Sequence, residues 1–259
     1  MTRQTVLIFA GLDPSGGAGI AADILAVAAQ GAHALPIVTT LTVQDNERVF
    51  DALAVASETL ARQAQALIDR IGIDAVKIGI PGSRANALVI ADVILRLRRR
   101  HPQLPVVLDP VLASGHGDAL SREDALQALA PLLPLTTLIV PNLPEAHALR
   151  GAGMTLGEQA QHLQARGCRH VLVTGGHGGG DTVHNRRFGP GADGARHEWR
   201  WPRLPGEFHG SGCTLAAAIA ARLAQGDPMA AALDRAQAYC HQALAASYAI
   251  APGQRMPLR

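Results

Sequence analysis

The chain has 259 residues, of which 48% are hydrophobic, 17% charged and only 3% aromatic, and its formal net charge is +2. This is enough apolar material for one sizeable core, and the near-neutral charge excludes a basic field that would attract nucleic acid or an anionic membrane surface. Three cysteines without paired spacing exclude a disulfide framework and a zinc site. With no cleavable signal pattern and no run of membrane-spanning length, we expect a cytoplasmic protein.

Strand and helix patterns alternate along the whole chain. Short apolar runs predict strands over 5–10, 34–40, 74–79, 105–108, 136–140 and 170–174, with an extended continuation over 41–50. Helical spacing predicts helices over 21–30, 58–70, 84–100, 122–133 and 156–166, from Pro144, after Gly210, and over 228–248. Residues 182–188 and 196–204 indicate two exposed antiparallel strands. No linker or repeat divides the chain, so we predict one doubly wound α/β domain over 1–259 with a mostly parallel sheet.

The first glycine-rich turn, residues 11–19, joins a buried strand to a helix. This is the geometry that places ligands at the carboxyl ends of parallel strands. Its spacing is neither that of a dinucleotide-binding fingerprint nor that of a phosphate loop ending in Gly-Lys-Ser/Thr. Two interpretations are open for Asp13 and Asp23. Either both side chains face a ligand, or Asp13 caps the turn and Asp23 is exposed to solvent.

Polar residues follow two further strands. Asp109 places a carboxylate where the 105–108 strand ends, an edge at which α/β sheets build their sites. Asn142 and Glu145 stand where the next strand hands over to a helix with Pro144 near its start. Helix capping alone also explains Asn142 and Glu145. The glycine-rich turn over 175–181 covers a ligand or ends a hairpin.

The turn from Gly210 to Thr214 opens an alanine-rich helix. Unpaired N–H groups and the helix dipole make such a turn an anion cradle, and glycine lets the backbone approach a ligand. Cys213 stands at its rim, where a thiol acquires a lowered pKa or acts as a positioned proton acceptor. The alternative is a glycine-rich helix start with a small buried cysteine.

Four segments in this order resemble the hydroxymethylpyrimidine/phosphomethylpyrimidine kinases of thiamin biosynthesis. They are Gly11-Leu12-Asp13-Pro14-Ser15-Gly16-Gly17-Ala18-Gly19-Ile20-Ala21-Ala22-Asp23, Pro141-Asn142-Leu143-Pro144-Glu145-Ala146, Val173-Thr174-Gly175-Gly176-His177 and Gly210-Ser211-Gly212-Cys213-Thr214-Leu215. The resemblance implies a three-layer α/β/α ribokinase-like fold with helices on both faces of the sheet. It also implies transfer of phosphate from ATP to the hydroxymethyl group of 4-amino-5-hydroxymethyl-2-methylpyrimidine, and a second transfer that makes the diphosphate. Relatives of this kind are commonly homodimers.

The resemblance implies roles position by position. Gln44 matches the residue that holds the pyrimidine, because an amide can donate to and accept from an aminopyrimidine edge. Cys213 matches the catalytic base, and the backbone of Gly210, Ser211 and Gly212 matches the anion hole. The remaining matches are Gly11, Ala18, Asp23, Val111 and Ile80 at the substrate, Thr174, Gly176 and Asn142 at the nucleotide, and Asp109, Asn142 and Glu145 around Mg²⁺.

The sequence departs from the family pattern at two positions. The loop after the Asp109 strand reads Gly115-His116-Gly117-Asp118 where relatives carry a lysine before Ser-Gly-Asp, which puts the second phosphorylation in question. Ile80 replaces a frequent methionine, a swap of similar volume.

Three other functions compete with this reading. A pyridoxal or pyridoxine kinase of the same family acts on a ring alcohol of similar size. A non-catalytic pyrimidine sensor is disfavoured because Cys213, Asn142 and Glu145 are retained. A dinucleotide-binding dehydrogenase is disfavoured by the glycine spacing.

Overall fold

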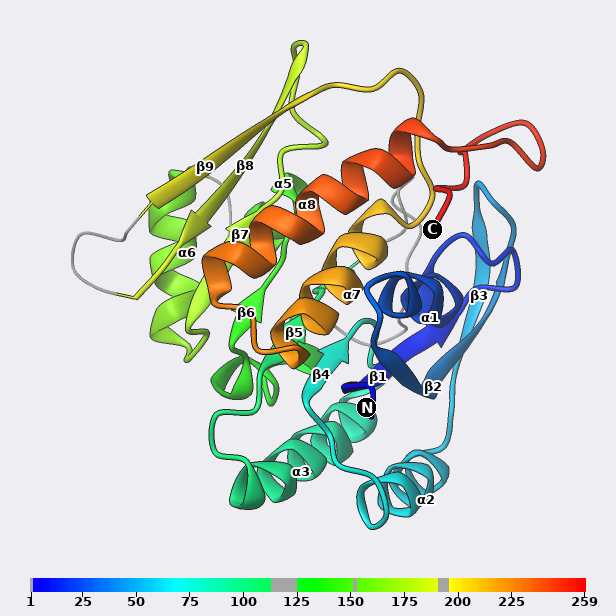
Figure 1. Ribbon diagram of the computed structural model, residues 1–259, viewed down its shortest axis with the longest axis vertical. Coiled ribbons are helices and arrows are strands. Elements are labelled where there is room, and N and C mark those ends of the chain that lie inside the picture. Colours follow the sequence, from blue (N-terminus) through cyan, green and yellow to red (C-terminus); the bar gives the residue numbers. More distant parts are fainter. Residues whose placement is uncertain (1, 113–124, 151–152, 191–195) are drawn as a thin grey trace.

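The computed structural model describes residues 2–112, 125–150, 153–190 and 196–259 (Figure 1). Within these ranges nine strands form one sheet in the order β3-β2-β1-β4-β5-β6-β7-β8-β9. The strands are β1 (Thr5–Leu12), β2 (His33–Gln44), β3 (Val49–Ala54), β4 (Ala75–Ile78), β5 (Val106–Leu108), β6 (Leu138–Ile139), β7 (His170–Val173), β8 (Thr182–Phe188) and β9 (Arg196–Pro202). The helices are α1 (Gly19–Ala29), α2 (Ser57–Ile68), α3 (Arg84–Arg100), α4 (Ala125–Leu129), α5 (Leu143–Arg150), α6 (Leu156–Ala165), α7 (Ser211–Ala224) and α8 (Met229–Ala245), with a short 3₁₀ turn η1 (Leu133–Leu135).

The six central strands, β2, β1, β4, β5, β6 and β7, run parallel. In β1, for example, Phe9 pairs with Ile37 of β2 and with Ile78 of β4. The outer strands β3, β8 and β9 are antiparallel additions. Because the carboxyl ends of parallel strands meet at one edge, the loops that follow β1, β4, β5, β6 and β7 gather there.

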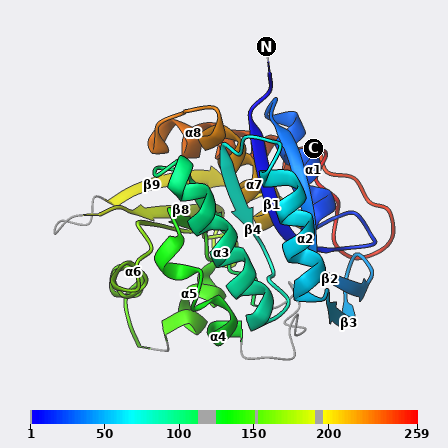
Figure 2. The same cartoon turned by 90° about the horizontal axis from the view of Figure 1, so that it is seen from below.

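Helices cover both faces of the sheet, as the alternation of side chains along β1 requires. Leu7 and Phe9 point into a core shared with α2, α3, α5 and α6, whereas Val6 and Ile8 point into a core shared with α1, α7 and α8. Figure 2 shows these two helix layers on opposite sides of the sheet. The three-layer α/β/α architecture predicted from the sequence is confirmed.

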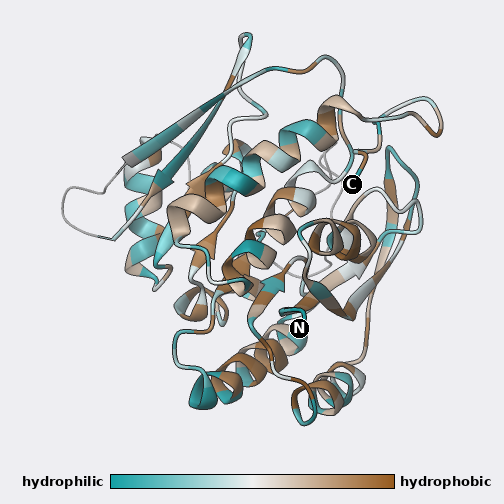
Figure 3. Ribbon diagram, viewed as in Figure 1, coloured by the Kyte–Doolittle hydropathy of each residue, from teal (hydrophilic) through white to brown (hydrophobic). Residues whose placement is uncertain are grey.

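Apolar residues concentrate in the central strands and in the sheet-facing sides of the helices (Figure 3). The alanine run of α7 from Ala216 to Ala221 is fully buried. Such small side chains let a helix axis lie close to the sheet. The polar end of α3 carries Arg98, Arg99 and Arg100 in its last turn, where cations interact favourably with the helix dipole.

Two predicted elements differ from the structure. The expected extended run over 41–50 turns back at Asp45, whose carboxylate accepts hydrogen bonds from the backbone N–H groups of Glu47 and Arg48. This Asx-type turn makes β2 and β3 a hairpin. The helix expected over 122–133 ends at Leu129 in its described part, because Pro131 lacks the N–H that a continuing helix needs.

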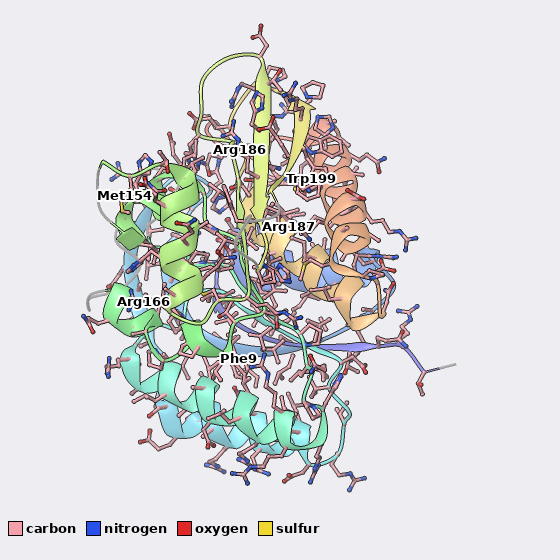
Figure 4. The ribbon with its side chains drawn as sticks, turned by 90° about the vertical axis from the view of Figure 1, so that its left-hand side faces the viewer. Phe9, Met154, Arg166, Arg186, Arg187 and Trp199 are labelled. Carbon is pink, nitrogen blue, oxygen red and sulfur yellow. The ribbon has the colours of Figure 1, made fainter. Side chains whose placement is uncertain are left out.

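The predicted antiparallel pair β8–β9 is confirmed, and it extends the sheet at one edge. It is not wholly exposed, because α8 covers part of it. Trp199 lies between β9 and α8 (Figure 4), and its indole N–H donates to Asp234 of α8 over 2.6 Å. On β8, Asn185 donates to Gln237 of α8 over 2.8 Å. No described helix combines the length and the apolar character needed to cross a membrane.

Candidate active site

A cavity of about 870 Å³ opens at the carboxyl edge of the parallel strands and reaches the start of α7. Its size suits a small ring compound together with part of a nucleotide. Fourteen of the fifteen predicted site residues line it: Gly11, Ala18, Gln44, Ile80, Asp109, Val111, Asn142, Glu145, Thr174, Gly176, Gly210, Ser211, Gly212 and Cys213. Asp23 is the exception.

The turn at Gly210 forms the start of α7. Gly210 adopts φ 70°, and a Cβ on it would lie 2.0 Å from the carbonyl oxygen of Gly17, so only glycine fits. Ser211, Gly212 and Cys213 are the first three helical residues, and their N–H groups have no acceptor within the helix. The cavity therefore ends on a set of free backbone donors at a helix N-terminus, which is an arrangement suited to a phosphate group.

The thiol of Cys213 lies beside the carboxylate of Asp109 and near the N–H of Gly19. Burial raises the pKa of Cys213 to about 12, although the charge of Lys77 opposes this shift. The lowered pKa expected from the helix N-terminus is therefore wrong. Desolvation outweighs the dipole here, because the thiolate would lie next to the negative charge of Asp109.

Below the cavity, Lys77 and Asp23 form a fully buried ion pair, with Nζ 2.8 Å from Oδ2. Lys77 Nζ also lies 3.9 Å from Asp109 Oδ2. Burial raises the pKa of Asp23 to about 6, with Lys77 opposing the shift. Asp23 is therefore neither solvated nor part of the cavity wall, and its predicted contact with the substrate is corrected to a contact with Lys77. Burial lowers the pKa of Lys77, but its three acidic neighbours Asp23, Cys213 and Asp109 raise it more, and the net shift is upward.

Sequence reasoning left Lys77 without a role. Its signal was a single charge within the otherwise apolar strand Ala-Val-Lys-Ile, a pattern that indicates a paired buried charge.

Asn142 and Glu145 form a reciprocal cap at the start of α5. The N–H of Asn142 donates to Glu145 Oε2 and the N–H of Glu145 donates to Asn142 Oδ1, each over 2.8 Å. Capping therefore accounts for their conformation. Burial and the nearby charge of Asp109 nevertheless raise the pKa of Glu145 to about 8. Two carboxylates that disfavour each other's ionisation create a place where a cation is stabilising.

The side-chain oxygens at this place would hold Mg²⁺ only together with water ligands. Asp109 Oδ2 is buried and has no hydrogen-bond partner, which leaves an oxygen available for a metal or its water. Among the described residues no group of three or more His, Cys, Asp or Glu side chains converges to hold a metal ion. The two carboxylates and Asn142 therefore fit a magnesium ion that keeps several of its waters.

Another part of the cavity contains Gln44 within a hydrogen-bonded network. His209 is the centre of this network. Its Nε2 lies 3.4 Å from Gln44 Nε2 and 2.8 Å from Asp13 Oδ2. Its Nδ1 lies 2.9 Å from Gln254 Oε1. Asp13 also accepts bonds from the N–H groups of Ser15 and Ala18. Although burial opposes it, bonding to His209 and Ser15 holds the pKa of Asp13 below its usual range. Asp13 thus caps the glycine turn, which is the second of the two roles considered for it from the sequence.

The remaining predicted residues lie where the chain leaves β7. Thr174 and Gly176 follow β7, and Arg203 donates to the carbonyl oxygens of Gly176 and Gly180 over 2.7 and 2.6 Å. The glycine-rich turn therefore both ends the β7–β8 hairpin and borders the cavity. Sequence analysis missed Arg203, His209 and Gln254, because only the fold brings them to the site. The loop 114–118, where the family lysine is missing, lies outside the described residues.

The raised pKa of Cys213 predicts slow exchange with an aromatic disulfide reagent at pH 7.5. Raising the pKa from 9.0 to about 12 lowers the thiolate fraction about a thousandfold, and the stronger nucleophilicity of a more basic thiolate recovers part of the loss. We expect a rate about 50-fold below that of an ordinary thiol, still rising above pH 10.

Cys213→Ser is the control, because it leaves only Cys168 and Cys240, two buried thiols whose pKa values burial raises to about 12, and so measures their contribution to the rate. Rapid labelling of Cys213 at pH 7.5, with a plateau below pH 9.0, would contradict the raised pKa.

Comparison with known proteins gives a consistent picture. A sequence model of the phosphomethylpyrimidine kinase family matches residues 13–258. The hydroxymethylpyrimidine/phosphomethylpyrimidine kinase of Rhizobium meliloti (strain 1021) is 37% identical over 260 residues, which cover 96% of this chain and 93% of that protein. The thiamine biosynthesis bifunctional protein ThiED of Geobacter sulfurreducens is 38% identical over 249 residues, 93% of this chain and 49% of that protein.

A solved structure confirms the ribokinase-like fold. The ADP complex of Bacillus subtilis pyridoxal kinase superposes with a TM-score of 0.84 at 26% identity, covering 99% of this chain and 98% of that one. The family expected from the four sequence motifs is also confirmed, since its model spans nearly the whole chain. The chain belongs to the phosphomethylpyrimidine kinase family.

Proposed function

We propose that this protein transfers the γ-phosphoryl group of ATP to the hydroxymethyl group of 4-amino-5-hydroxymethyl-2-methylpyrimidine, and then phosphorylates the monophosphate to the diphosphate. One observation carries the proposal: the cavity joins the amide of Gln44 to the free N–H groups at the start of α7, with Cys213 and Asp109 beside them. The names of the relatives supply the acceptor, and the site supplies groups suited to both halves of the reaction.

The pyrimidine would lie between Gln44 and an apolar wall. The Gln44 amide can donate to a ring nitrogen and accept from the 4-amino group. Gly11 and Ile80 face the same space, since a Cβ on Gly11 would lie 3.7 Å from Ile80 Cδ1. With Ala18 and Val111 these residues leave room for a flat ring. Thr174, Gly176 and Asn142 would contact the nucleotide.

In the transfer, the acceptor oxygen attacks the γ-phosphorus, the bond to the β–γ bridging oxygen breaks, and ADP leaves. The N–H groups of Ser211, Gly212 and Cys213 stabilise the charge on the transferred group. The hydroxyl proton moves to Cys213 Sγ as the thiol proton moves to the neighbouring carboxylate of Asp109. This relay starts from a neutral thiol, which agrees with the raised pKa of Cys213.

Burial raises the pKa of Asp109 and so makes it a better proton acceptor, although Lys77 opposes the shift. Asp109, Asn142 and Glu145 would hold Mg²⁺ largely through its waters, and the bound ion would neutralise phosphate charge.

Cys213→Ala tests the relay directly. We expect kcat to fall by about 10² to 10⁴, because the variant removes the group that first receives the proton. The affinity for a non-hydrolysable ATP analogue, measured by calorimetry, stays within about twofold, since ATP contacts the backbone of the turn rather than the thiol. Unchanged turnover in this variant would remove Cys213 from the mechanism.

The acceptor is identified by ADP release in a coupled assay with ATP and Mg²⁺, run separately on the hydroxymethylpyrimidine, its monophosphate and pyridoxal. We expect turnover of the first two. Turnover of the hydroxymethylpyrimidine alone would make this a single-step kinase. Activity on pyridoxal alone would favour the second candidate, which the likeness to the pyridoxal kinase structure supports. Tight pyrimidine binding with no turnover would indicate a sensor.

We further propose that residues 1–259 act as one domain in a cytoplasmic homodimer. The three cysteines are free thiols, as is usual in a reducing compartment. One apolar surface supports the dimer: Leu41, Val43 and Leu53 lie on the side of the β2–β3 hairpin that faces away from Gln44, and are 46%, 52% and 48% exposed. Exposed apolar side chains that gather on one face mark interaction sites.

The dimer predicts a mass of about twice 27.0 kDa by light scattering, and Val43→Asp should shift it toward the single chain. Leu95→Asp is the matched control, because Leu95 is 51% exposed on α3, away from the hairpin. A wild-type mass equal to one chain would refute the dimer.

A further inference from the structure

Arg259 lies behind the anion-binding turn and outside the cavity wall. Its guanidinium Nη2 donates to the carbonyl oxygen of Gly17. The same nitrogen lies 3.4 Å from the carbonyl oxygen of His209 and 3.5 Å from that of Gly210. Nε donates to Thr214 Oγ1 over 2.8 Å. One guanidinium thus joins the glycine turn after β1 to the turn that starts α7, and Figure 1 shows this end of the chain beside the start of α7.

The two turns are in direct contact at these carbonyls. The carbonyl of Gly17 lies where a side chain on residue 210 would begin, and Ala18 Cα lies 2.8 Å from the same point. The Gly17 and Gly210 carbonyl oxygens also share one cationic donor, because both accept from Arg259 Nη2. The fork of an arginine side chain supplies several N–H donors in fixed directions, and a positive charge strengthens each bond.

These bonds also determine where the backbone N–H groups point. In a planar trans peptide the C=O and the N–H point in opposite directions. The Gly210 carbonyl accepts from the N–H and the hydroxyl of Thr214 over 2.9 and 2.8 Å, and Arg259 reinforces this direction through the Thr214 hydroxyl and a longer contact of 3.5 Å. The N–H of Ser211 therefore points the opposite way, and Ser211 lines the cavity. In the same way, holding the Gly17 carbonyl directs the N–H of Ala18 to Asp13, which accepts it over 2.7 Å.

We propose that Arg259 is a positioning residue that aims the N–H groups of the anion turn at the transferred phosphoryl group and fixes that turn against the substrate loop. This inference deepens the proposed phosphotransfer and rests on it for its kinetic consequence. Thr214 extends the same network, because its hydroxyl accepts from Arg259 and donates to the Gly210 carbonyl over 2.8 Å.

Arg259→Met tests the proposal, since it keeps most of the apolar stem and removes every donor. We expect kcat to fall about 10- to 100-fold, as small misplacement of reacting groups does, while the affinity for a non-hydrolysable ATP analogue stays within about twofold. Arg259→Lys keeps the charge and part of the bonding, so its kcat should lie between those of the wild type and Arg259→Met. It also serves as the test variant if Arg259→Met does not fold.

Arg255→Met is the matched control. Its guanidinium donates to the hydroxyl and carbonyl oxygens of Ser247 and not to the carbonyls of Gly17 and Gly210. The backbone bonds of Arg255 to Glu207 and His209 remain in this variant. We expect it to retain the wild-type kcat. If Arg255→Met loses as much activity as Arg259→Met, or if Arg259→Met keeps its kcat within about twofold, the positioning role is wrong.

Amide hydrogen exchange gives a readout that does not depend on the acceptor. We expect Arg259→Met to accelerate amide exchange about tenfold in peptides spanning 13–20 and 206–214, because loss of a hydrogen bond from a charged donor lowers the free energy of local opening by the amount that gives a tenfold change. Exchange in the peptide spanning 182–188 should not change. Unchanged exchange in both turns would show that Arg259 is not a positioning residue, even if the enzyme is an active pyrimidine kinase. If the wild type turns over no pyrimidine, the proposed function is wrong. The exchange rates of the two peptides would still show whether Arg259 holds the two turns together.

Discussion

A single buried ammonium group determines the electrostatics of this site. Lys77 is fully buried, and a charge in that position is tolerable only when paired. Alternation along β4 turns Val76 and Ile78 toward the core of α2 and α3, so Lys77 faces the opposite layer. There it meets Asp23 of α1 and lies near Asp109 after β5. Removing one partner of such a pair costs about 3–5 kcal/mol, which ties the position of α1 to the floor of the cavity.

The position of α7 follows from the size of its side chains. Its run of buried alanines lets the helix pack on β1, β4 and β5, the strands that end at the cavity. This packing brings its first turn to the carboxyl ends of those strands, where Cys213 meets Asp109. Gly210 then lets its backbone touch that of Gly17, and Gly17 leaves room for the side chains of His209 and Met256. The position of the turn that starts α7 therefore depends on small residues along the whole helix and not only on those that line the cavity.

Much of this could be predicted from the sequence. Apolar runs and helical spacing predicted the layers, and fourteen of the fifteen predicted site residues line the cavity, because ligands of parallel sheets lie on loops that directly follow strands. What local patterns could not supply were contacts between distant segments. The pairing of Lys77 with Asp23, the Asp13–His209–Gln254 network and the bond from Arg259 to Gly17 join residues separated by 45 to 242 positions. The lowered pKa of Cys213 failed for a related reason, since burial and the neighbouring Asp109 are properties of the fold and not of a helix start.

The acids buried near Lys77 carry excess negative charge when all of them are ionised. Lys77 brings one positive charge, whereas Asp23, Asp109 and Glu145 bring three negative charges when all are ionised. The raised pKa values of all three acids show that the protein alone does not stabilise this state, with burial as the first cause in each. Complete pairing by more buried cations would stabilise the free protein but would leave no place for a metal ion. The excess negative charge therefore costs stability in the free protein, and the same excess would favour binding of a divalent cation beside the phosphates.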